Sequence, residues 1–326
     1  MFSSPRFRAI RMAVLKSVGA IRMAVSKSKW RAILQALFVT FLWSTSWVLI
    51  KRTLHEIPPL TFAGLRYTIA FIILLPGLWK YKPEIRAISP RDWRRLIALG
   101  LVFYAMTQGG QFLTLKHLEA VTFSLLLNFS TVLVAFFGII ALKEIPSRLQ
   151  WGGISLFVLG ALVYFSSAFE SGEAFRSSGQ TLGLALAGFT VCANAVASLQ
   201  GRSINREKNI PPLVVTVISM GVGAICLLGT GLAVQGLPPL SPAGWAAIVW
   251  LAVVNTALAF TLWNKSLQVL SAVESSIINN TMLVQIAALA WLLLDERLTW
   301  RDVAGLALAM VGVLMVQVTR VQSSDG

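Results

Sequence analysis

The most regular feature of this sequence is a succession of apolar runs, each about twenty residues long. A helix needs roughly 20 apolar residues to cross the hydrocarbon core of a bilayer. We therefore predict an all-α transmembrane chain. Its ten predicted helices have the approximate bounds 31–50, 60–79, 95–115, 120–142, 149–168, 179–200, 212–234, 244–266, 272–294 and 302–319.

The second half of the chain repeats the first half at a distance of 152 residues. Asn128 and Glu144 return at this distance as Asn280 and Glu296. Further matches are Leu118 with Leu270, Ser124 with Ser276, Gly153 with Gly305 and Gly160 with Gly312. Five predicted helices per half is an odd number, so the second half enters the membrane from the opposite side. The pattern predicts two inverted five-helix repeats around a central cavity, an arrangement that many transporters use for alternating access.

This repeat divides the chain into five parts. They are a basic N-terminal tail (1–29), the first repeat (30–168), an external linker (169–178), the second repeat (179–320) and a C-terminal tail (321–326). The first tail carries the echo AIRMAV at 9–14 and 20–25. This eleven-residue period suits a helix with one basic face that lies on anionic lipid. The alternatives are a disordered tail and a true start at Met23.

Composition and charge agree with a membrane protein. Only 13% of the residues are charged and 56% are apolar, against about 25% charged in soluble proteins. The net charge of +15 would suggest a nucleic-acid partner in a soluble protein. Here 21 of the 28 Lys and Arg residues fall on the side of the N-terminus. The positive-inside rule then places both termini in the cytoplasm, and no nucleic acid is expected. We expect an integral multi-pass protein of the bacterial inner membrane. Cys192 and Cys226 lie within spans, so no disulfide framework is implied.

Three stretches in serial order resemble one transporter family. They are LWSTSWVLIKRTLHEIPPLTFAGLR, which ends at Arg66, LLLNFSTVLVAFFGIIALKE at 125–144, and SSIINNTMLVQIAALAWLLLDERL at 275–298. Together they resemble the EamA-type members of the drug/metabolite transporter superfamily. The resemblance implies ten helices in two inverted repeats, cytoplasmic termini and a cavity through which amino acids, other metabolites or drugs move outward.

The sequence departs from this family pattern at two places. The family's usual proline after the serine of the fourth helix is Thr131 here, which affects the expected kink of that helix. The ending Glu-Arg-Leu is present in the second half at 296–298, but the first half has Glu-Ile-Pro at 144–146.

Polar side chains inside the spans are the candidates for a binding site, because in lipid they need a partner or a water-filled path. They offer aromatic faces and amides with little charge, which suits a small zwitterion with an apolar or aromatic side chain. The candidate substrate-binding residues are Trp43, Trp47, Arg66, Tyr104, Gln108, Gln111, Asn128, Asn194, Asn255, Trp263 and Asn280. We expect the substrate chiefly to meet the first, third and eighth helices.

Some of these residues have a structural alternative. Asn128 and Asn280 are matched by the repeat, and we favour hydrogen bonds between helices as their first role. Arg66 is the only basic residue placed in the interior of a predicted span, away from its ends. It could receive a substrate carboxylate, or it could bond to carbonyls at a helix end. The glycines of the fifth, seventh and tenth helices favour bundle packing, and the oligomeric state stays open.

These features predict a transporter that exports small metabolites, with hydrophobic or aromatic amino acids as its first candidates. A lipid flippase and a multidrug exporter are the alternatives. Every acidic residue lies at a span edge or in a loop, which favours exchange or facilitated transport over proton antiport. The sequence contains no HExxH motif, no phosphate-binding glycine loop with lysine and no cysteine cluster, so we expect neither an enzyme nor a cofactor or metal.

Overall fold

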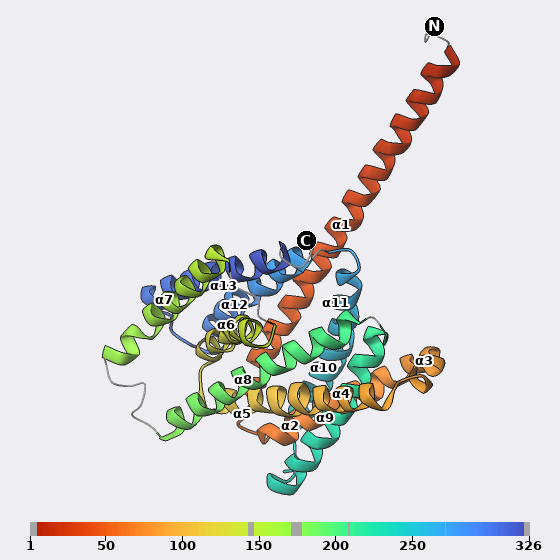
Figure 1. Ribbon diagram of the computed structural model, residues 1–326. Helices are drawn as coiled ribbons and strands as arrows, with labels where there is room; N and C mark the ends of the chain where they lie inside the picture. Colours follow the sequence, from red (N-terminus) through yellow and green to blue (C-terminus); the bar gives the residue numbers. More distant parts are fainter. Residues whose placement is uncertain (1–4, 143–146, 171–177, 208, 271, 323–326) are drawn as a thin grey trace.

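The computed structural model describes residues 5–142, 147–170, 178–207, 209–270 and 272–322, and within them every regular element is a helix (Figure 1). Side chains are described for 29–134, 136–137, 147–166, 178–205, 207, 209–270, 274–275 and 277–317. The predicted external linker and the last residues of the C-terminal tail fall largely outside these ranges, as does Glu144.

The helices follow the predicted apolar runs. They are α1 (Pro5–Thr53), α2 (Pro59–Leu74), η1 (Leu75–Tyr81), α3 (Lys82–Arg86), α4 (Pro90–Leu99), η2 (Gly100–Gln108), α5 (Gly109–His117), α6 (Ala120–Leu142), α7 (Arg148–Glu170), α8 (Ser178–Arg206), α9 (Pro212–Val234), α10 (Pro242–Ala252), η4 (Val253–Leu258), α11 (Ala259–Leu267), α12 (Ala272–Leu293) and α13 (Trp300–Gln322). Among the described residues, 8 helical segments are long and apolar enough to cross a membrane. Shorter apolar segments occupy Ala120–Val134 in α6 and Ile277–Leu293 in α12.

Helix α1 is longer than the predicted first span. It runs without a break from Pro5 to Thr53, and its first part projects from the bundle (Figure 1). The backbone of the basic N-terminal segment is therefore helical from Pro5, whereas the side chains of residues 5–28 are not described.

Prolines and serines set the starts of several helices. Pro59 and Pro212 are first residues of α2 and α9, where a missing N–H removes no helical bond. Ser89 and Ser241 cap α4 and α10 by accepting hydrogen bonds from backbone N–H groups three residues later. These two serines are 152 residues apart, so the same local chemistry starts the same helix in each half.

Two π-helical segments interrupt helices that the sequence predicts to be uninterrupted. Segment η2 separates α4 from α5, and η4 separates α10 from α11. In each, a threonine hydroxyl donates to the carbonyl five residues earlier, Thr107 to Val102 and Thr256 to Leu251, both at 2.8 to 2.9 Å. These bonds satisfy carbonyls in turns where the regular α-helical ladder is interrupted.

Helices α7 and α13 cross closely at four glycines. A Cβ atom on Gly160 would lie 2.4 Å from the backbone N of Ala309 and 2.6 Å from the carbonyl of Gly305. A Cβ on Gly312 would lie 2.4 Å from the backbone N of Phe157 and 2.6 Å from the carbonyl of Gly153. The two helices run antiparallel at this crossing, since Gly153 meets Gly312 and Gly160 meets Gly305. Only glycine permits such close approach of two backbones.

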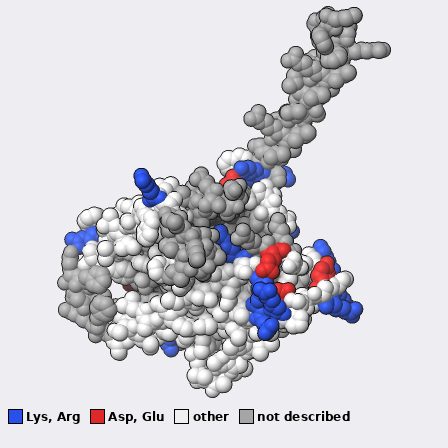
Figure 2. Space-filling view, viewed as in Figure 1, with Lys and Arg blue, Asp and Glu red and all other residues white. Residues whose placement is uncertain are grey.

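The bundle has two chemically different ends. We call "basic end" the end where Lys29 of α1 bonds Glu274 at 2.6 Å and Arg95 of α4 bonds Glu207, after α8, at 2.8 Å. Basic and acidic side chains also gather around α3 in the space-filling view (Figure 2). At the other end, the "opposite end", α1 finishes at Thr53.

Hydrogen bonds hold the helices together at the opposite end. The Nζ of Lys51 donates to the carbonyls of Leu115 and Leu118 at 2.8 and 2.5 Å. The buried carboxylate of Glu296 accepts from the first two backbone N–H groups of α6, at 2.7 and 3.1 Å. A carboxylate at a helix N-terminus satisfies otherwise unpaired N–H groups and the positive end of the helix dipole. Glu296 thus ties the segment after α12 to the start of α6.

Candidate functional site

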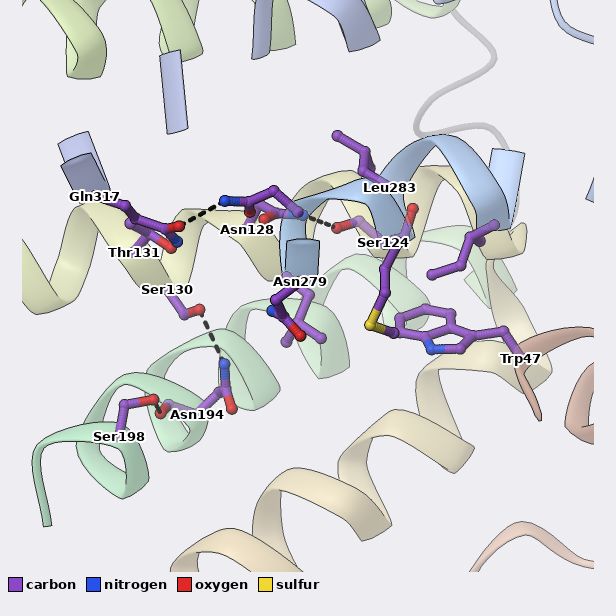
Figure 3. Close-up of a pocket in the computed structure, with 14 residues that line it drawn as sticks. Trp47, Ser124, Asn128, Ser130, Thr131, Asn194, Ser198, Asn279, Leu283 and Gln317 are labelled. Atoms are coloured by element: carbon purple, nitrogen blue, oxygen red, sulfur yellow. Dashed lines mark hydrogen bonds between the residues drawn. The ribbon is translucent and has the colours of Figure 1, made fainter. Parts of the chain in front are cut away.

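A cavity of about 300 Å³ lies between α1, α6, α8, α12 and α13 (Figure 3). The side chains that line it, among the described residues, are all uncharged. They are Trp47, Ser124, Leu127, Asn128, Ser130, Thr131, Asn194, Ser198, Asn279, Asn280, Met282, Leu283, Ile286 and Gln317. This volume suits a small metabolite, and small-molecule sites commonly start at this size.

The cavity has an apolar part and a polar part. Trp47 and Leu283 lie on one side in Figure 3, whereas Asn194 and Ser198 lie on the other, and Thr131 and Gln317 extend the polar part. Aliphatic residues of α12 accompany the Trp47 ring. The arrangement can therefore bury an apolar group against Trp47 while amides and hydroxyls bind a polar group.

Neighbouring groups position the amides of this cavity. The Nδ2 of Asn194 donates to the hydroxyl of Ser130 at 2.9 Å, and that of Asn280 donates to the side-chain carbonyl of Gln317 at 2.5 Å. Asn128 donates to the backbone carbonyl of Ser124 at 2.8 Å. An amide side chain has two donors and two acceptor lone pairs, so these bonds leave capacity for a ligand.

Four of the residues predicted from the sequence line this cavity. They are Trp47, Asn128, Asn194 and Asn280. The other lining groups are not among the predicted site residues, although two leave a signal in the sequence. Ser198 follows Asn194 by one helical turn, and Gln317 is a polar residue in the last apolar run.

The remaining predicted residues lie outside the cavity. Trp43 packs on Trp263 with ring centroids 5.2 Å apart. The amide of Asn255 is fully buried and donates to the carbonyl of Leu42. Tyr104 is also buried, and Gln108 and Gln111 share its helical segment from η2 to α5. None of the described residues that line the cavity comes from α4 to α5 or from α10 to α11, which are the predicted third and eighth helices.

Arg66 is likewise separate from the cavity. Its side chain is buried, and its Nε donates to the hydroxyl of Thr256 in η4 at 3.0 Å. The guanidinium carbon lies 5.3 Å from the ring centroid of Tyr67 and 6.0 Å from that of Phe112. Two ring faces and one hydroxyl stabilise this cation between α2 and η4.

The cavity continues toward the basic end and is closed on the other side. An adjoining cavity of about 310 Å³ shares Ser130, Thr131, Ser198 and Gln317 with it, and adds Val134 and Arg202. Toward the opposite end, the ring of Trp47 packs on Phe123 with centroids 5.2 Å apart. The Lys51 and Glu296 hydrogen bonds lie beyond this aromatic pair. Among the described residues, the cavity therefore extends toward the basic end.

The comparisons with known proteins agree with a transporter. The EamA-like transporter family matches residues 30–166 and again residues 181–318. An S-adenosylmethionine/S-adenosylhomocysteine transporter of Chlamydia muridarum is 25% identical over 267 residues, which cover 78% of this chain and 82% of the relative. A probable amino-acid metabolite efflux pump of Salmonella typhimurium is 25% identical over 290 residues, which cover 85% and 92% of the two chains.

The fold is also found in a solved protein. A crystal structure aligns with 89% of this chain and 98% of its own length, with a TM-score of 0.61 and 17% sequence identity. The two family matches together span most of the sequence, one in each half. The chain belongs to the EamA-like transporter family.

Proposed function

We propose that this membrane transporter exports small metabolites that carry an α-amino-acid group and an apolar or aromatic side chain. The observation that carries the proposal is the two-part cavity, in which Trp47 and aliphatic residues face amides and hydroxyls. The relatives are named for amino-acid metabolites and for S-adenosylmethionine and S-adenosylhomocysteine. These compounds share an α-amino-acid group, which suits uncharged hydrogen-bonding amides.

The proposed mechanism is alternating access by ten helices in two inverted repeats, 30–168 and 179–320. Two independent observations support it. The family matches the chain twice, once in each half. At the crossing of α7 and α13, the surroundings of Gly160 recur around Gly312, and each neighbouring residue is replaced by the one 152 positions away. Such reciprocal contacts are the signature of a twofold axis between like units.

The proposed orientation places the basic end in the cytoplasm of a bacterial inner membrane. Of the 28 Lys and Arg residues, 21 belong to segments on the side of the N-terminus, as the positive-inside rule expects of a cytoplasmic surface. The cavity continues toward this end. The described conformation would thus face the cytoplasm, where an exporter loads its substrate.

The proposed energy source is substrate exchange or a substrate gradient. Neither cavity is lined by a carboxylate among the described residues. Glu119, in the turn before α6, lies beyond the Trp47 and Phe123 pair, and burial together with the nearby Glu296 raises its pKa. A proton-coupled carrier usually has a carboxylate on the substrate path.

Counterflow in proteoliposomes tests this function. Vesicles loaded with unlabelled phenylalanine should accumulate labelled phenylalanine or leucine. Replacing Asn194 by alanine should lower the rate about tenfold or more, because a hydrogen bond to a charged group contributes about 1.5 to 3 kcal/mol. Asn205 is the matched control, since it is an exposed amide on the same helix that bonds only the carbonyl of Gly201 in the described contacts. Asn205→Ala should leave the rate unchanged.

Two results would contradict the proposal. One is the absence of counterflow for every amino acid tested, combined with scrambling of labelled lipid, which would favour a flippase. The other is equal loss of rate in the Asn194→Ala and Asn205→Ala proteins, because the cavity would then have no special role.

A further inference from the structure

Three polar residues follow one another along a single face of α8. Asn194, Ser198 and Arg202 are spaced four residues apart, so their side chains lie in one row. Asn194 and Ser198 line the main cavity, and Ser198 and Arg202 line the adjoining cavity. The row therefore leads from the centre of the cavity to the basic end.

Arg202 stands out in this row because of its charge. Among the described residues that line the two cavities, it is the only charged one. Its side chain is exposed at the mouth. Two described carboxylates of the basic end have other partners, because Glu207 bonds Arg95 and Glu274 bonds Lys29. In the described part of the chain, no carboxylate forms an ion pair with Arg202.

We propose that Arg202 is a specificity-determining residue that binds the carboxylate of the substrate as it enters the cavity. The inference rests on the proposed function and extends it, because it predicts selection for anion-bearing metabolites over their neutral or cationic analogues. A guanidinium presents a planar set of donors that fits a carboxylate with two hydrogen bonds. No lining carboxylate of the described residues competes for it.

The geometry assigns Arg202 to entry rather than to the final binding pose. Eight residues separate Asn194 from Arg202, which is about 12 Å along a helix axis. An amino acid whose side chain reaches Trp47 lies deeper than the guanidinium. Arg202 therefore raises the rate at which the substrate is captured, and this effect should depend on ionic strength.

The test compares two substrates that differ only in the carboxylate. Uptake of labelled phenylalanine and of labelled phenylalaninamide is measured into proteoliposomes that contain wild-type protein, Arg202→Gln or Arg202→Lys. Arg202→Gln should raise KM for phenylalanine about fivefold, the upper end for an exposed ion pair. It should leave the maximal rate unchanged and should not lower the uptake of the amide, which has no carboxylate for Arg202 to bind. Arg202→Lys should restore most of the loss.

A salt series and a control variant complete the test. In wild type, KM for phenylalanine should rise between low and high salt, whereas in Arg202→Gln it should stay nearly constant. Arg148 is the control, because it is an exposed arginine at the start of α7 and lines neither cavity. Arg148→Gln should behave as wild type. Each variant is first checked for monodispersity and melting temperature.

The outcomes separate this inference from the proposed function. Normal phenylalanine transport with the same KM in Arg202→Gln overturns the inference and leaves the proposed function intact. Absence of transport in wild type for phenylalanine and every other amino acid tested contradicts the proposed function. In that case the thermal shift of wild type and Arg202→Gln is measured with a panel of metabolite acids and their amides. The inference is overturned if no acid stabilises wild type more than its amide does, or if Arg202→Gln keeps that preference.

Discussion

The crossing of α7 and α13 gives a stability prediction that can be worked out from distances. In a Gly160→Ala protein, the added Cβ would lie 2.4 Å from the backbone N of Ala309 and 2.6 Å from the carbonyl of Gly305. Ordinary contacts of a Cβ begin near 3.4 Å, so the two helices must separate by 0.8 to 1.0 Å. Both neighbours are backbone atoms, and no rotation of a side chain can relieve the contact.

The separation has a definite energetic cost. A gap of 0.5 to 1 Å removes about a quarter to a half of the dispersion energy of the contacts across it, and overpacked sites lose about 1 to 3 kcal/mol in free energy of unfolding. Gly188 on α8 is the matched control, because a Cβ there would meet no atom within 4 Å. Gly188→Ala should gain up to about 1 kcal/mol from the reduced backbone entropy of the unfolded chain.

The measurement is the melting temperature of each purified protein in one detergent. Gly160→Ala should melt at least about 3 °C below Gly188→Ala, since 1 kcal/mol corresponds to about 2 to 4 °C in proteins of 150 to 250 residues. Gly312→Ala should match Gly160→Ala, because its Cβ meets backbone atoms at the same 2.4 and 2.6 Å. Equal melting temperatures for Gly160→Ala and Gly188→Ala would refute the close crossing, and a stable Gly312→Ala beside an unstable Gly160→Ala would refute its twofold character.

Three further predictions concern other contacts. Asn255→Leu should lower the free energy of unfolding by about 0.5 to 1.5 kcal/mol, because it removes one hydrogen bond to the carbonyl of Leu42, which still accepts from the hydroxyl of Thr45 at 2.7 Å; thermal unfolding measures the loss, and an unchanged melting temperature would contradict it. Glu296→Gln should lower the free energy of unfolding by about 1 to 2 kcal/mol, because the two N–H groups of α6 lose a charged acceptor. Thermal unfolding measures this loss as well, and a stabilised variant would contradict the capping role. The backbone N–H and hydroxyl of Ser241 lower the pKa of Glu56, in the turn after α1, below its ordinary 4.5. The stability from this contact should be complete above pH 4.5 and disappear as the pH falls through the lower pKa of the folded protein. The melting temperature difference between wild type and Glu56→Gln should thus be constant from neutral pH to about pH 5 and vanish in more acidic buffer; a difference that persists there would contradict the assignment.

The helices were predictable from the sequence because the bilayer imposes a simple rule. Apolar runs of sufficient length define the spans, and each predicted run lies within helices of the structure to within one residue at its ends. The repeat of 152 residues likewise pointed to the glycines that meet at the crossing of α7 and α13. These features depend on local composition and on spacing, both of which can be read from one chain.

The location of the cavity was less predictable, because it depends on the direction in which each polar side chain points. Trp43 and Trp47 are one turn apart, yet Trp43 packs on Trp263 while Trp47 lines the cavity. Asn255 and Asn194 are both amides within apolar helices, but one bonds a backbone carbonyl in the core and the other lines the cavity. A rotation of a few tens of degrees about the helix axis separates these outcomes. Composition carries no information about that rotation.

The interrupted helices have a consequence for the history of the chain. Segment η2 spans 100–108 and η4 spans 253–258, which corresponds to 101–106 after subtraction of the 152-residue repeat. A π-turn holds one residue more than an α-turn, so a single inserted residue in a helix can create it. Two independent insertions at the same place are a coincidence that needs explanation, whereas one insertion before duplication needs none. On this account, the extra residue was already present in the unit that was duplicated, and both halves have inherited it while most of their sequence diverged.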